Sequence, residues 1–98
     1  MALKVVVRRR ERVLRTQIVS DSVVRVGTHA NAGIRVEDDS KATQLHAVIE
    51  LNDRGATLID LGSDAGTVVN GKRVNRCKLQ VGDEILIGTT SLLVEALG

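Results

Sequence analysis

The feature that most constrains this chain is the shortness of its apolar runs, which turn signals interrupt at intervals of about ten residues. No stretch keeps the i, i+3, i+4, i+7 spacing of an amphipathic helix over three turns. Short runs of β-branched residues between glycine, asparagine and aspartate are typical of an antiparallel sandwich or barrel. The sequence therefore predicts an all-β fold with ten to eleven short strands.

Turn residues set the boundaries of these strands. Asn70-Gly71 is the strongest hairpin signal, because both positions accept the positive φ of a type I′ turn. A second hairpin turn is expected over 52–55. The ranges expected to form strands are 3–8, 13–19, 23–27, 33–36, 46–51, 56–60, 67–69, 73–74, 84–87 and 91–95. We expect them to form a sandwich of two sheets with long loops at one end.

Composition narrows the partners. The chain has no Phe, Trp or Tyr, so its core must be aliphatic, and it lacks platforms on which bases or prolines could stack. A net charge of +2 does not by itself indicate nucleic acid. The only basic run is Arg8-Arg9-Arg10, followed by Arg12 and Arg15. It is read either as a solvated turn and strand face or as a patch for an acidic partner.

Cysteine content and hydropathy bear on location. Cys77 is the single cysteine, so no internal disulfide can form, which suits a reducing compartment. We expect it to follow the 73–74 strand, face a loop and serve as a spare thiol. The amino-terminal residues lack the apolar centre of a signal peptide, and no apolar run approaches the ~20 residues of a membrane span. The sequence predicts one cytoplasmic domain over 1–98, either complete or one end of a longer protein.

No set of residues points to catalysis, a metal or a cofactor. His29, His46 and Cys77 lack the spacing of zinc ligands. Asp38-Asp39 lies in a polar loop, and both carboxylates are expected to be solvated. No nucleophile-elbow, phosphate-loop or dinucleotide motif is present. The expected class is a binding module and not an enzyme.

Five stretches carry glycine, hydroxyl and apolar residues in a distinctive order. They are 24–28 (V-R-V-G-T), 33–39 (G-I-R-V-E-D-D), 43–49 (T-Q-L-H-A-V-I), 60–71 (D-L-G-S-D-A-G-T-V-V-N-G) and 79–88 (L-Q-V-G-D-E-I-L-I-G). In order and spacing they resemble the motif blocks of the forkhead-associated (FHA) domain family, including S-R-x-H-A-x-I and D-L-x-S-T-N-G-T-x-V-N-G. The resemblance covers approximately residues 4–95.

The resemblance implies a sandwich of two antiparallel sheets whose loops at one end bind phosphothreonine peptides. The positions equivalent to that ligand face are Thr28, Thr43, Gln44, Asp64 and Ala65. The positions that the resemblance assigns to bracing of the loops are Gly27, His46, Gly66, Asn70 and Gly71. His46 is expected to hold the loops by hydrogen bonding, without touching phosphate.

The ligand-face positions depart from the family pattern. Thr28 stands where the family has the arginine that contacts phosphate, and Ala65 stands where it has the asparagine that clamps the peptide backbone. Gln44 replaces an arginine, while Thr43 keeps the hydroxyl of the family's serine. Asp64 places a carboxylate near the position of a dianionic ligand, where like charges repel.

These departures predict a degenerate FHA domain. It would bind a protein or peptide without needing phosphothreonine, or bind a segment of its own longer chain. One alternative is phosphothreonine binding through a rerouted site, with Thr43, backbone amides and charge from Lys41, Arg35 or Arg73. The alternative from another class is an acidic partner or nucleic acid bound by the Arg8–Arg15 ribbon.

Overall fold

Alternation of aliphatic and polar residues places one face of each strand in a common core. The computed structural model describes all 98 residues and contains eleven strands and no helix. In the 47–52 strand, Ala47, Ile49 and Leu51 are buried, and in the 55–60 strand Ala56 and Leu58 face them. Eighteen buried aliphatic residues form one cluster between the sheets. The aliphatic core expected from the missing aromatic residues is therefore present.

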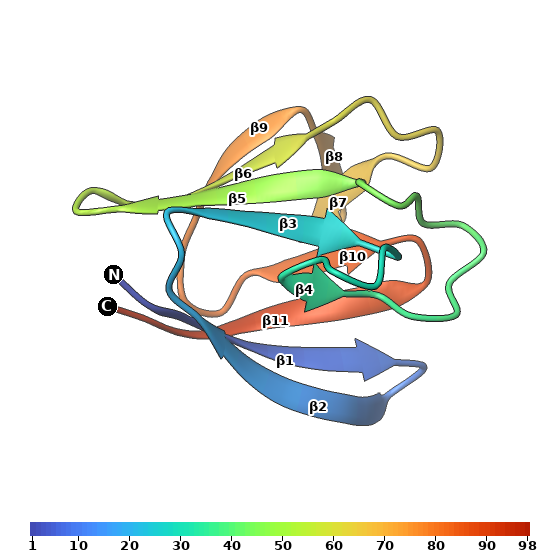
Figure 1. The fold of residues 1–98 in the computed structure, drawn as a ribbon, viewed down its shortest axis with the longest axis horizontal. Coiled ribbons are helices and arrows are strands. Elements are labelled where there is room, and N and C mark those ends of the chain that lie inside the picture. Colours follow the sequence, from blue (N-terminus) through green and yellow to red (C-terminus); the bar gives the residue numbers. More distant parts are fainter.

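The strands form two sheets that pack face to face (Figure 1). The six-stranded sheet has the order β2 (Arg12–Val19), β1 (Leu3–Arg9), β11 (Thr90–Leu97), β10 (Glu84–Ile87), β7 (Thr67–Val69) and β8 (Lys72–Val74). The five-stranded sheet has the order β4 (Ile34–Arg35), β3 (Val23–Gly27), β5 (Ala47–Asn52), β6 (Gly55–Asp60) and β9 (Arg76–Leu79). The predicted all-β sandwich is confirmed.

One strand was not expected from the sequence. Strand β9 pairs with β6 at the edge of the five-stranded sheet, and Cys77 lies opposite Leu58. The prediction that Cys77 faces a loop was wrong, because its side chain is half-buried and packs against the core. Its thiol donates a weak hydrogen bond to the Lys78 carbonyl oxygen, at 3.4 Å.

The β1–β2 hairpin carries a bulge that matters for the surface described below. Arg8 pairs with Val13 and Val7 pairs with Arg15, so Leu14 is the extra residue. In a regular strand, residues three apart point to opposite faces, but the extra residue brings Arg12 and Arg15 onto one face. That face is shared with the buried Val7 side chain, so it is the face toward the other sheet.

Both central residues of the β1–β2 turn have positive φ, 51° at Arg10 and 65° at Glu11. These are the dihedral signs of a type I′ turn, which favours Asn-Gly because other residues are strained there. The β7–β8 turn has the same signs and does carry Asn70-Gly71. The two hairpins thus have the same turn conformation, but only the β7–β8 turn carries residues that favour it.

Replacing the strained pair should stabilise the protein. We expect R10N/E11G to raise the free energy of unfolding by about 1 kcal/mol, which raises the melting temperature by about 4–8 °C in a domain of this size. Thermal unfolding followed by circular dichroism measures it. The comparison variant G71A, at a position with a φ of 83° and open space around it, should lower the melting temperature. An unchanged or lower melting temperature for R10N/E11G would contradict the strain argument.

Candidate functional site

Three loops meet at one end of the sandwich. They are 28–33 between β3 and β4, 36–46 between β4 and β5, and 61–66 between β6 and β7. In Figure 1 they lie on the right, together with the β10–β11 turn and the β1–β2 turn, while the β5–β6 hairpin and both termini lie on the left.

No helix that could cross a membrane is present.

A buried histidine connects two of these loops. The His46 side chain is fully buried, and its Nδ1 accepts a hydrogen bond from the Thr43 amide at 3.2 Å. Because Nδ1 is an acceptor, the neutral ring carries its proton on Nε2, which donates to the Gly66 carbonyl oxygen at 2.9 Å. The main chain of His46 also donates to Val26 and accepts from the Leu61 amide. One residue thus contacts both loops and the end of β3.

A glycine lets the third loop approach. The Thr28 amide donates to the Thr43 carbonyl oxygen at 3.0 Å, and the His29 amide donates to the Gln44 carbonyl oxygen at 3.3 Å. A Cβ at Gly27 would lie 2.0 Å from that Gln44 oxygen, so only glycine permits this contact. A continuous chain of hydrogen bonds therefore runs from Thr28 through Thr43 and His46 to Gly66.

The predicted ligand-face positions follow from this chain. Thr43 and Gln44 are exposed and Thr28 is half-buried, on two loops that are hydrogen-bonded to each other. Asp64 and Ala65 are exposed directly before Gly66. The structure brings these five positions to one end of the molecule, although their role in binding stays a prediction.

Two of the positions assigned to loop bracing lie elsewhere. Asn70 and Gly71 form the β7–β8 turn, and the Asn70 side chain bridges to the β9–β10 turn. It donates to the Asp83 carboxylate at 2.9 Å and accepts from the Glu84 amide at 3.0 Å. The hydrogen bonds of Asn70 therefore join two turns outside the three loops.

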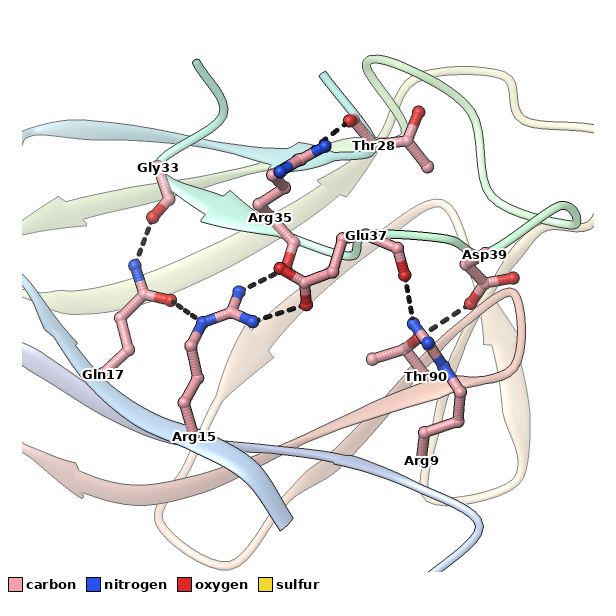
Figure 2. A network of polar contacts seen from close by, with 9 residues as sticks. All are labelled: Arg9, Arg15, Gln17, Thr28, Gly33, Arg35, Glu37, Asp39 and Thr90. Atoms are coloured by element: carbon pink, nitrogen blue, oxygen red, sulfur yellow. Dashed lines mark hydrogen bonds and ion pairs between the residues drawn. The ribbon is translucent and has the colours of Figure 1, made fainter. Parts of the chain in front are cut away.

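Two arginines reach the loops from neighbouring strands. The Arg35 Nε on β4 donates to the Thr28 carbonyl oxygen at 3.3 Å (Figure 2). The Arg73 guanidinium on β8 lies against Gly66, where an added Cβ would come within 2.6 Å of its Nε. The Arg73 Nη2 also donates to the Ser63 carbonyl oxygen at 3.5 Å. Both cations border positions where the sequence lacks the family's arginine and asparagine.

Two carboxylates, the half-buried Asp60 and the buried Asp39, fix the shapes of two loops. Asp60 accepts hydrogen bonds from the Ser63 and Thr67 hydroxyls, both at 2.7 Å, and from the Gly62 amide at 3.0 Å. Burial raises the pKa of Asp60, but these hydrogen bonds outweigh burial and hold the pKa below its ordinary value of 3.8. These hydrogen bonds fold the 61–66 loop around the Asp60 carboxylate.

Asp39 does the same for the 36–46 loop. Its carboxylate accepts from the Thr90 hydroxyl and the Thr89 amide, both at 2.8 Å, and from the Lys41 amide at 3.2 Å. Burial raises the pKa of Asp39, and the hydrogen bonds from Thr90, Thr89 and Lys41 lower it further than burial raises it. The prediction that both Asp38 and Asp39 are solvated was wrong for Asp39, which is 5% exposed.

A small hollow lies beside the Gln44 position. It has a volume of about 150 Å³. The residues around it are Arg25, His29, Asn31, Ala32, Gln44 and Leu45. The Gln44 side chain thus stands at the rim of a recess that could take one side chain of a bound peptide.

Comparison with known proteins now places the chain. The model of the FHA domain family matches residues 24–88, well over half of the sequence. The chain belongs to the FHA domain family. The match begins at β3 and ends after β10, so it contains the three loops, His46 and Gly66.

Curated relatives of this FHA domain are bacterial. The oxoglutarate dehydrogenase inhibitor of Corynebacterium efficiens is 37% identical over 67 residues, which is 68% of this chain and 46% of the relative. The glycogen accumulation regulator GarA of Mycobacterium tuberculosis is 30% identical over 76 residues, 78% of this chain and 46% of GarA. The chain therefore spans slightly under half the length of these relatives.

Solved FHA domains superimpose on nearly the whole chain. A domain described in a study of phosphothreonine-dependent FHA interactions has a TM-score of 0.83 and 27% identity, covering 95% of this chain and 96% of that one. The FhaA FHA domain, solved in complex with the intracellular domain of Rv3910, has a TM-score of 0.82 and 27% identity, covering 93% and 99%. The FHA sandwich is therefore shared over more than nine-tenths of this chain.

Removing the His46 ring should destabilise the domain. H46A leaves the Thr43 amide and the buried Gly66 carbonyl without partners, so we expect a loss of about 1–3 kcal/mol in the free energy of unfolding. Urea denaturation measures it. H29A is the matched control, because His29 is exposed and should change stability by less than about 0.5 kcal/mol. Equal stability of H46A and the parent would refute the bracing role.

Asp39 should make stability depend on acid pH. Its folded pKa lies below 3.8, so its contribution is present above that pH and is lost as the pH falls through the folded pKa. We expect D39N to lose about 1–3 kcal/mol at pH 7, and the difference from the parent to shrink below pH 3.8. D38N is the control, since Asp38 is exposed. A difference that stays constant between pH 7 and pH 2.5 would contradict this assignment.

Proposed function

We propose that this FHA domain is a protein-interaction module, not an enzyme, which binds its partner through the 28–33, 36–46 and 61–66 loops without requiring phosphothreonine. The observation that carries the proposal is the combination of converging loops with Thr28 and Ala65 at the positions of the family's phosphate and backbone contacts. The loops are present at one end of the sandwich, but the arginine that would contact phosphate and the asparagine that would clamp the peptide backbone are not.

Magnitudes support a loss of phosphopeptide affinity. A charge-assisted hydrogen bond contributes about 1.5–3 kcal/mol and a neutral one about 0.5–1.5 kcal/mol, so lacking the arginine and the asparagine removes about 2–4 kcal/mol. That corresponds to a factor of about 30–1,000 in affinity. Asp64 adds a carboxylate that is exposed and makes no ion pair, and it would repel a dianion nearby.

The relatives support a protein or peptide as the partner. One is named as an inhibitor of oxoglutarate dehydrogenase, and the FhaA domain was solved with an intracellular domain of another protein. Because the chain spans under half of its curated relatives, the bound segment can also belong to the same polypeptide. A cytoplasmic location remains a prediction.

A second candidate is phosphothreonine binding through relocated charges. Arg35 contacts Thr28 and Arg73 lies against Gly66, next to Ala65. Each arginine therefore places a guanidinium beside a position that lacks the family's contact residue. Arg35 uses only its Nε on the Thr28 carbonyl, which leaves its other donors for a ligand. The exposed Thr43 hydroxyl would be the remaining contact. A solved relative described as phosphothreonine-dependent also favours this candidate.

The test compares paired peptides and restores the missing groups. We expect a phosphothreonine peptide library to bind the parent no better than its unphosphorylated counterpart in calorimetry. The triple variant T28R/D64T/A65N should gain about 100-fold in phosphothreonine affinity, because the three loops already converge. Each single variant should gain little, since the three changes act on one ligand.

Three outcomes decide between the candidates. A phospho-dependent Kd in the low micromolar range for the parent, lost in R35Q/R73Q, would replace the first candidate with the second. A parent without phosphate preference and a triple variant that acquires it would support the first. A folded triple variant with no phosphate preference would show that the loops do not form one ligand face.

A further inference from the structure

The Arg8–Arg15 stretch does not act as one basic ribbon, because the fold divides its arginines into two groups. Arg15 forms an ion pair with Glu37 at 2.6 Å and also donates to the Arg35 carbonyl oxygen. Arg9 donates to the Glu37 carbonyl oxygen at 2.5 Å and to the Thr90 hydroxyl at 2.8 Å. Figure 2 shows both guanidiniums turned toward the β4–β5 loop. These two arginines join the hairpin to that loop.

The remaining cations surround a hollow. Arg10 and Arg12 are exposed on the hairpin, Lys41 is exposed on the β4–β5 loop, and none of the three forms an ion pair. They border a notch of about 710 Å³ between hairpin and loop. The residues around this basic notch are Arg9, Arg10, Arg12, Leu14, Asp38, Ser40, Lys41 and Thr89.

The charge of the basic notch is unbalanced. Four cations and one carboxylate, Asp38, line it. Arg9 does not cancel its charge, because its partners are a neutral carbonyl and a neutral hydroxyl. The chain as a whole carries a net charge of only +2. Its positive excess is therefore concentrated at one site, which is the condition for attracting an anionic ligand.

The notch is also held in shape before any ligand binds. Its hairpin wall is fixed by Arg9 and Arg15, and its loop wall is fixed by the buried Asp39 between Asp38 and Ser40. The bulge at Leu14 sets Arg12 on the same face as Arg15, toward the loop. Preformed walls reduce the ordering that binding would otherwise cost.

We propose that the basic notch formed by Arg10, Arg12 and Lys41 is a second binding surface, which takes an acidic stretch of a polypeptide. Several carboxylates in an extended chain would reach all three cations at once, while Leu14 offers apolar contact. Lys41 lies on the same 36–46 loop as Thr43, but neither Thr28, Thr43 nor Ala65 lines the notch, so its binding does not depend on phosphothreonine.

A polypeptide fits the notch better than a nucleic acid. The chain has no aromatic side chain on which a base could stack. The cations enclose one hollow, and the neighbouring Arg9 and Arg15 are engaged inward, so no row of free cations continues along a phosphate backbone. Asp38 and the exposed Glu11 also stand near the notch and oppose a long polyanion.

The test uses a fluorescein-labelled peptide of ten glutamates in 50 mM NaCl, read by fluorescence anisotropy. The parent should bind it, and the affinity should fall as salt is added. R12Q/K41Q should weaken binding about tenfold, since two peripheral charges are removed. The matched control R54Q/K72Q removes two exposed charges from the β5–β6 hairpin and β8, and should change binding less than twofold. Amide shifts on titration should concentrate at 10–14 and 38–41.

Four results would overturn the proposal. They are no binding at 50 mM NaCl, equal weakening by R12Q/K41Q and R54Q/K72Q, shifts centred on the 28 and 65 positions, and tighter binding of a ten-residue oligothymidylate with the same sensitivity to R12Q/K41Q. The last result would assign the notch to nucleic acid. Thr28, Asp64 and Ala65 do not line the notch, so the phosphopeptide affinity of T28R/D64T/A65N is measured independently and failure here is distinguishable from failure of the proposed function.

Discussion

The hydrogen bonds of one buried imidazole hold the loop end of this FHA domain in place. The Thr43 amide fixes the tautomer of His46 by donating to Nδ1, and this leaves Nε2 to donate to Gly66. None of these contacts involves the side chains at positions 28, 64 or 65. The scaffold can therefore keep its shape while those side chains change.

A second set of polar contacts ties the two sheets together at the same end. Asp39 follows the five-stranded sheet's β4, and its partners Thr89 and Thr90 belong to the β10–β11 turn and the start of β11 in the six-stranded sheet. Arg9 bonds to the same Thr90 hydroxyl, so hairpin, loop and turn share one cluster (Figure 2). Burial of the aliphatic core holds the two sheets together but does not fix their relative position, because hydrophobic contacts have no preferred geometry. The hydrogen bonds of this cluster do have a preferred geometry, and they fix the sheets relative to each other at the end where the loops meet.

Local patterns were enough to predict most of the strands but not the contacts between distant ones. Alternation of aliphatic residues located strands such as β3 and β10 with their observed bounds. Strand β9 was missed because only Cys77 and Leu79 face inward and a single residue separates it from β8. Burial of Asp39 could not be foreseen, because its partners lie about fifty residues away along the chain. The contact of Asn70 with Asp83 is of the same kind.

The bulge at Leu14 shows why the charged residues were hardest to assign. Read as a plain strand, 12–19 would put Arg12 and Arg15 on opposite faces, and the arginines would form a solvated ribbon. The one-residue shift sends Arg15 to Glu37 and leaves Arg12 beside the notch on the same face. Two arginines of one strand thus have different roles, because the register shift at Leu14 changes where each side chain lies. Thr28 and Ala65 stand where the family carries an arginine and an asparagine, while Arg10, Arg12 and Lys41, which form no ion pair, line the notch beside the hairpin. An anionic partner would accordingly be drawn to the hairpin side, whatever occupies the loops.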